Sequence, residues 1–124
     1  MPFTAGRPLT EAKAELFKAL AHPARVRVLE LLAEGEHTIG ELAAESGLEL
    51  SHLSQQVTVL RRAGIVDSRR VKSTVVCVLR DPQTAELLAV ARRLIGNNLR
   101  QGQALLDALD HADDAVAAAE RTRA

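Results

Sequence analysis

Apolar side chains recur every three to four residues along most of this chain, which is the spacing of amphipathic helices. The pattern predicts helices over residues 10–21, 23–34, 38–46 and 51–63 and a longer one over 82–109. Between the last two helices the period changes. Residues 65–79 are rich in β-branched side chains and are interrupted at Val71-Lys72-Ser73, which predicts a β-hairpin.

Capping residues and prolines set the limits of these elements. Side chains suited to helix starts stand at Thr10, Thr38, Ser51 and Asp81. Gln55 would complete a capping box with Ser51. Pro23 and Pro82 occupy first-turn positions, where their missing N–H costs nothing. Glycines follow the second, third and fourth helices, at Gly35, Gly47 and Gly64.

The length of 124 residues is that of one domain. We expect a loose lead-in over residues 1–9, a folded domain over 10–110 and a disordered tail over 111–124, where alanine and charged residues dominate. The chain has two Phe and neither Trp nor Tyr, so the core must be aliphatic. The scarcity of aromatic rings excludes a stacking platform for single-stranded nucleic acid.

The compartment is predicted from what the sequence lacks. Cys77 is the only cysteine, so no intrachain disulfide can form. No apolar run approaches the roughly 20 residues of a membrane-spanning helix, and Met1-Pro2-Phe3-Thr4 does not begin a signal peptide. We therefore expect a cytoplasmic protein with no membrane partner.

The formal net charge is zero, but the charges are unevenly distributed along the chain. Residues 50–80 carry six basic side chains and one acidic side chain, a net charge of +5. Residues 1–49 carry a net charge of −3 and residues 81–124 a net charge of −2. The zero is thus a cancellation, and the basic centre is compatible with a nucleic-acid partner.

A short helix, a tight turn and a second helix follow one another over residues 38–63, which is the order of a helix-turn-helix. Glutamine, serine and threonine side chains can read base edges in the major groove of double-stranded DNA, and arginines suit phosphates. The second helix offers such side chains at Ser51, His52, Ser54, Gln55, Gln56, Thr58, Arg61 and Arg62.

Three further basic residues lie near the tip of the hairpin, at Arg69, Arg70 and Lys72. Beside a reading helix they would supply a second contact with phosphates or the minor groove. The alternative for the arginines and Lys72 is a solvated charged face without a ligand. His52 has a similar alternative, as an exposed residue at a helix start.

Four stretches resemble the ArsR/SmtB family of winged helix-turn-helix transcriptional regulators, and the resemblance covers about residues 12–95. They are Phe17–Arg25, Ile39–Ala43, Leu53–Leu60 and Ala63–Val66. The resemblance implies a mainly α fold with a small β-hairpin, in the order ααααββα. It also implies a homodimer on a palindromic operator, most often as a repressor, with the helix over 51–63 in the major groove and the hairpin over 65–79 as the wing.

The same resemblance implies a dimer interface built from the first and last helices. The last helix also has more apolar side chains than one face of so small a domain needs, which independently favours a partner helix from another chain. The candidate interface residues are Leu16, Leu20, Leu88, Ala91, Ile95, Leu99 and Leu106.

The metal-sensing residues of many family members are missing. Residues 38–43 contain no cysteine, and no histidine lies between Pro82 and Leu109. We therefore expect no required cofactor and leave the inducer unassigned. Asp107 and His111 are weak candidates for a nickel or zinc ion, because a spacing of four residues puts both on one helix face. A solvating tail and a metal-responsive regulator with a non-standard site are both compatible with this pair.

Other functions find less support. Cys77 lies in a valine-rich strand, where a thiol usually acts as a small hydrophobe rather than as a sensor. An enzyme is not predicted, because no nucleophile–base set or glycine-rich phosphate loop is present, and the adjacent Ser51 and His52 do not face each other on a helix. The alternative from another class is a protein-interaction module that pairs with a partner or co-regulator protein.

Overall fold

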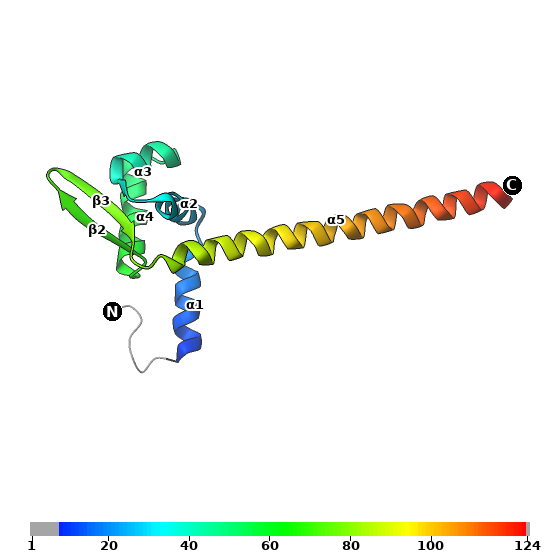
Figure 1. Cartoon of the computed structure of the whole chain (residues 1–124), viewed down its shortest axis with the longest axis horizontal. Coiled ribbons are helices and arrows are strands. Elements are labelled where there is room, and N and C mark those ends of the chain that lie inside the picture. The colour runs from blue at the N-terminus through cyan, green and yellow to red at the C-terminus, as the bar shows by residue number, and fades with distance from the viewer. Residues whose placement is uncertain (1–7, 124) are drawn as a thin grey trace. The chain divides into compact units, whose positions relative to one another are not determined.

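The computed structural model describes residues 8–123 and divides the chain into two units, Met1–Leu87 and Leu88–Ala124. The helices are α1 (Leu9–Leu20), α2 (Pro23–Glu34), α3 (Ile39–Ser46), α4 (Leu50–Arg62) and α5 (Gln83–Arg123). The strands are β1 (His37–Thr38), β2 (Val66–Val71) and β3 (Thr74–Leu79). In the first unit the β2–β3 hairpin stands beside α4 (Figure 1).

The helix-turn-helix formed by α3 and α4 begins with a capping box. The Thr38 hydroxyl accepts a hydrogen bond from the backbone N–H of Glu41, and the Glu41 carboxylate accepts one from the backbone N–H of Thr38. These hydrogen bonds hold the pKa of Glu41 below its ordinary value, because they favour the charged carboxylate. At the other end Gly47 has a φ of 73°, a left-handed conformation that ends α3 with little strain.

The sheet has three antiparallel strands in the order β1-β3-β2. Only the hairpin was predicted, because β1 is two residues long and carries no periodic signal. Val71 pairs with Thr74, so Lys72 and Ser73 form the whole turn. The sequence has no glycine there, and Lys72 instead takes a φ of 58°, in the left-handed region that few non-glycine residues adopt.

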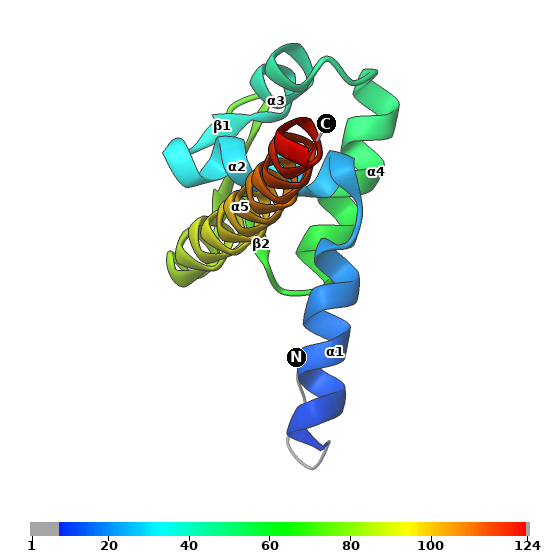
Figure 2. The ribbon, with the colours of Figure 1, turned by 90° about the vertical axis from the view of Figure 1, so that its right-hand side faces the viewer.

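The core is aliphatic, as predicted, and is shared by α2, α3, α4 and the sheet. Figure 2 shows β1 beside α2 and α3. The side chains with less than 2% exposure are Leu29, Leu42, Leu53, Leu60, Val28, Val66 and Cys77. Leu20 is the only buried residue that α1 contributes, and the rest of α1 extends away from the other helices of this unit (Figure 2).

Two of the predicted helix caps are wrong. The first helix begins at Leu9 after Pro8, so Thr10 is already inside it. The fourth begins at Leu50 with Glu49 in the cap position and no side-chain cap. Ser51 instead donates its hydroxyl hydrogen to the Glu49 carboxylate over 2.8 Å. By contrast, the Asp81 carboxylate accepts a hydrogen bond from the backbone N–H of Gln83, as expected for the start of the last helix.

The last helix differs from the prediction at its far end. It continues to Arg123, whereas the sequence predicted a helix to about Leu109 and a disordered tail over 111–124. The physical reason is composition, because residues 112–119 are mostly alanine and lack glycine and proline. The structure divides the chain between Leu87 and Leu88, and the folded domain predicted over 10–110 stays a prediction. Most of the predicted lead-in over 1–9 lies outside the described residues.

Candidate nucleic-acid interface

The helix α4 sorts the predicted DNA-contacting residues into three rows. Leu53, Val57 and Leu60 form its buried side. Opposite them, at intervals of four, three and four residues, lies an outward row made of Ser51, Gln55, Thr58 and Arg62. Three of these four are exposed and Thr58 is half-exposed. A polar row at this spacing is the face that a reading helix turns toward base edges.

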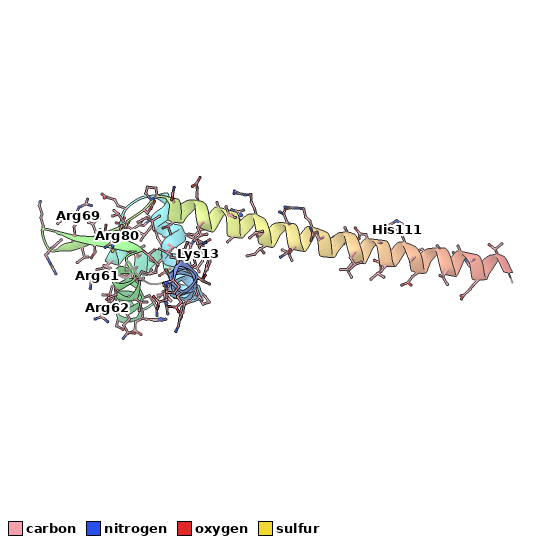
Figure 3. The ribbon with its side chains drawn as sticks, turned by 90° about the horizontal axis from the view of Figure 1, so that it is seen from below. Lys13, Arg61, Arg62, Arg69, Arg80 and His111 are labelled. Carbon is pink, nitrogen blue, oxygen red and sulfur yellow. The ribbon has the colours of Figure 1, made fainter. Side chains whose placement is uncertain are left out.

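A second row lies on the flank of α4 that is next to the hairpin. It contains Ser54 and Arg61. The Arg61 guanidinium donates a hydrogen bond to the hydroxyl of Ser68 in β2 over 3.4 Å, which ties the end of α4 to the wing. Figure 3 shows Arg61 and Arg62 on α4, with Arg69 and Arg80 on the hairpin side.

The third row lies on the opposite flank and faces the junction of α1 and α2. The rings of His52 and His22 meet edge to face, with 6.3 Å between their centroids. The side-chain oxygen of Gln56 accepts a hydrogen bond from the Nε of Arg25 over 3.0 Å. His52 and Gln56 are therefore half-buried residues with partners inside the protein, unlike the exposed Gln55.

The basic residues of the hairpin differ in their surroundings. Arg69 forms an ion pair with Glu36 over 3.0 Å, and both side chains are more than half exposed. Arg80, counted in the basic segment, is paired with Asp67 over 2.8 Å. Arg70 and Lys72 are exposed on the strand end and the turn. Neither carboxylate partner was predicted, because Glu36 lies 33 residues before Arg69 and Asp67 lies 13 residues before Arg80.

The predicted dimer residues fall into two groups. Leu20 is 8% exposed and belongs to the core of this chain, and its place in an interface stays a prediction. Leu16 and Leu88 are half-buried. The remaining predicted positions are exposed, at Ala91, Ile95, Leu99 and Leu106. On α1 the exposed Phe17 adds a large apolar side chain that the prediction left out.

The candidate metal and thiol residues are also placed. On α5 the Nδ1 of His111 lies 2.7 Å from the backbone oxygen of Asp107, whose carboxylate accepts a hydrogen bond from Gln103. Within residues 8–123 no three His, Cys, Asp or Glu side chains gather as metal ligands. The Asp107–His111 site stays a prediction. Cys77 is fully buried, and burial raises the pKa of its thiol although Arg61 acts in the opposite direction.

No helix in the part of the chain that the structure describes is both long enough and apolar enough to cross a membrane. The length of α5 would suffice, but charged side chains interrupt it throughout.

Comparisons with known proteins agree with this architecture. Residues 22–68, which hold α2 to the start of the wing, match the family described as "Bacterial regulatory protein, arsR family". An uncharacterized HTH-type transcriptional regulator of Mycobacterium tuberculosis, Rv0081, is 50% identical over 103 residues, which cover 82% of this chain and 90% of that protein. Its crystal structure has a TM-score of 0.71, over 77% of this chain and 97% of the other.

Two further relatives have described roles or assemblies. The biofilm growth-associated repressor of Agrobacterium fabrum is 45% identical over 75 residues, covering 60% of this chain and 64% of that protein. A homodimeric winged helix-turn-helix DNA-binding domain, Mb0332 of Mycobacterium bovis, has a TM-score of 0.69 at 27% identity, over 79% of this chain and 95% of the other. With its helix-turn-helix, wing and these relatives, the chain belongs to the ArsR family of DNA-binding transcription regulators.

Proposed function

We propose that this regulator represses transcription as a homodimer on a palindromic operator, with α4 in the major groove and the β2–β3 wing against the sugar-phosphate backbone. The observation that carries the proposal is the outward row of Ser51, Gln55, Thr58 and Arg62, which lies in the most basic segment of the chain. Exposed arginines and Lys72 on the adjoining wing would neutralise phosphates.

Exposed apolar surface supports the homodimer. On α1 Phe17 is 56% exposed, and on α5 Leu99 is 69% exposed. Large apolar side chains in such numbers mark an interaction surface in a protein of this size. Two identical subunits related by a twofold axis would present two copies of α4 about 34 Å apart, which is one turn of DNA and matches a palindrome.

Repression and the cytoplasmic location are parts of the same proposal. A named repressor is among the relatives, which supports this sign of regulation. A repressor acts by occupying a promoter, which requires binding and no catalysis, so the proposed function is not that of an enzyme. Bacterial DNA lies in the cytoplasm, and the proposed regulator has to act there.

A mobility-shift titration with the DNA upstream of its own gene tests the proposal. We expect a shifted complex whose affinity falls steeply with salt. The double substitution Arg69→Ala and Arg70→Ala should weaken binding to every sequence. The slope of the logarithm of the binding constant against the logarithm of the salt concentration should become less negative by about 0.9 per lost phosphate contact. Gln55→Ala should instead relax the preference at one base pair by about fivefold to tenfold.

A matched control is Arg93→Ala with Arg100→Ala on α5, which removes the same two charges far along the chain and should leave the titration unchanged. Normal binding by the wing variant at every salt concentration would contradict the phosphate contacts. Absence of any shifted complex with either operator DNA or random DNA would contradict the function itself.

A protein co-regulator is a second candidate partner, favoured by the continued exposure of Leu105, Leu109 and Val116 along α5. The oligomeric state of the purified chain separates the two possibilities. A stable dimer indicates that a second copy covers this helix. A monomer that gains DNA affinity only with a co-purified protein indicates a co-regulator.

A further inference from the structure

Arg25 links α2 to the end of α1 and to one flank of α4. It belongs to α2, and its Nη1 donates a hydrogen bond to the backbone oxygen of Ala19 in the last turn of α1 over 2.9 Å. Its Nε donates to the side-chain oxygen of Gln56 in α4 over 3.0 Å. Both hydrogen bonds are partly buried, which strengthens them relative to exposed ones.

The planar guanidinium makes this bridge specific. Its N–H groups point in fixed directions, so one side chain can hold a carbonyl of α1 and an amide of α4 together. The edge-to-face contact of His22 with His52 adds a second link from the same junction, one turn earlier on α4. This flank of the helix is therefore held in a defined orientation before DNA arrives.

We infer that Arg25 is a positioning residue for DNA recognition, because it holds the oxygen of Gln56 toward the α1–α2 junction and leaves the amide N–H groups to face DNA. A glutamine that reads adenine with two hydrogen bonds must direct its oxygen and its nitrogen at the same base edge. With its oxygen turned toward Arg25, Gln56 acts as a hydrogen-bond donor.

The base preference follows from this donor role, and it rests on the proposed placement of α4 in the major groove. A donor matches an acceptor on the base edge, such as N7 or O6 of guanine, N7 of adenine or O4 of thymine. Gln55, exposed on the outward row, keeps both its donor and its acceptor for adenine. Two adjacent glutamines thus recognise different base edges.

Selection of binding sites from a random double-stranded DNA pool, followed by titration against single-base variants of the selected site, tests this role. Gln56→Glu keeps an oxygen for Arg25 but removes the N–H donor. We expect it to lose about fivefold to tenfold of the discrimination at one base pair while its Tm does not fall. Arg25→Lys keeps the charge but lacks the planar fork, and it should lose the same preference at the same base pair.

A purely structural defect would lower the affinity for non-specific DNA as well as the base preference. Arg25→Lys should leave the non-specific affinity within about twofold of that of the unmodified protein, because the charge is kept. The matched control is Arg27→Lys, which changes an exposed arginine of the same helix and should alter neither quantity. If Arg25→Lys misfolds, Gln56→Glu still tests the donor role of Gln56, and an unchanged preference in that variant overturns the inference.

An unchanged preference in either folded variant would overturn the inference while leaving the regulator function intact. If the unmodified protein and the Arg27→Lys variant select no sequence at all, the proposed function fails first, and the positioning role falls with it. Loss of the same base preference in both variants, with Arg27→Lys unaffected, supports the role of Arg25.

Discussion

The part of the chain from Leu20 to β3 and the part of α5 beyond Leu87 use apolar residues in opposite ways. All the buried hydrophobic side chains of the described residues lie between Leu20 and Cys77. Along α5, in contrast, Leu94, Ile95 and Leu99 are each at least 59% exposed. The first region satisfies its apolar surface within one chain, whereas the second leaves it exposed and available to the proposed second copy. Stability and the proposed assembly therefore belong to separate segments.

The largest effect should come from the core. Leu42 in α3 is fully buried, and Leu42→Ala should lower the free energy of unfolding by about 2–5 kcal/mol through lost burial and a cavity. Leu50→Ala is the matched control, because this leucine of α4 is 56% exposed and should change stability by about 0.5 kcal/mol or less. Urea unfolding followed by circular dichroism measures both. Equal changes in the free energy of unfolding for the two variants would contradict the distinction between buried and exposed leucines.

The next effect concerns assembly. Charged residues on the apolar side of α5, introduced as Leu99→Asp together with Leu106→Asp, should convert the proposed dimer to a monomer, because each subunit would bury two charges in the interface. Sedimentation velocity measures the change. Arg93→Asp with Arg100→Asp is the control on the charged side of the same helix. A dimer that survives the leucine substitutions would show that α5 is not the interface.

A smaller effect concerns the capping box of α3. Because the pKa of Glu41 is depressed in the folded chain, the carboxylate stabilises it at neutral pH, and this stabilisation is lost as the pH falls through that lowered pKa. Glu41→Gln should therefore lower Tm at pH 7, and the difference should shrink as the pH falls below the ordinary pKa of a glutamate. Glu34→Gln serves as the control. A difference that grows on acidification would contradict the assigned sign.

The smallest expected effect concerns metal ions. Among the described residues no three His, Cys, Asp or Glu side chains gather as ligands, so we expect nickel or zinc to leave DNA affinity within about twofold of its metal-free value. Calorimetric titration of both ions into the protein and into the Asp107→Ala, His111→Ala variant checks this. Binding of either ion to the unmodified protein that disappears in the variant would instead show that Asp107 and His111 form a metal site on α5.

Local signals in the sequence predicted most of the fold. The helix-start residue Thr38, the glycine at Gly47 and the change of period at Ile65 each act within a few residues, and each gave the right element. The prediction of Ser51 as the cap was wrong because the helix begins two residues earlier than its cap chemistry suggested, with Glu49 in the cap position. The far end of α5 was missed because alanine favours a helix even among charged residues.

The candidate site was predictable as a set of residues but not as an arrangement. Spacing alone identified the polar residues of α4, yet it treated Gln55 and Gln56 alike. Their difference depends on Arg25, which lies 31 residues before Gln56 and comes close to it only through the packing of α2 on α4. Periodicity carries no information about such a contact. The same holds for Glu36 and Arg69, which meet across the sheet.

The turn of the wing has a consequence for protein engineering. Lys72 holds a left-handed conformation that costs a non-glycine residue roughly 1 kcal/mol or more. A glycine would relieve that cost and make the hairpin more stable, but it would also remove a cation from the proposed DNA-contacting tip. At this residue a gain in thermal stability is expected to cost affinity for the operator, so a variant selected for stability should bind DNA more weakly.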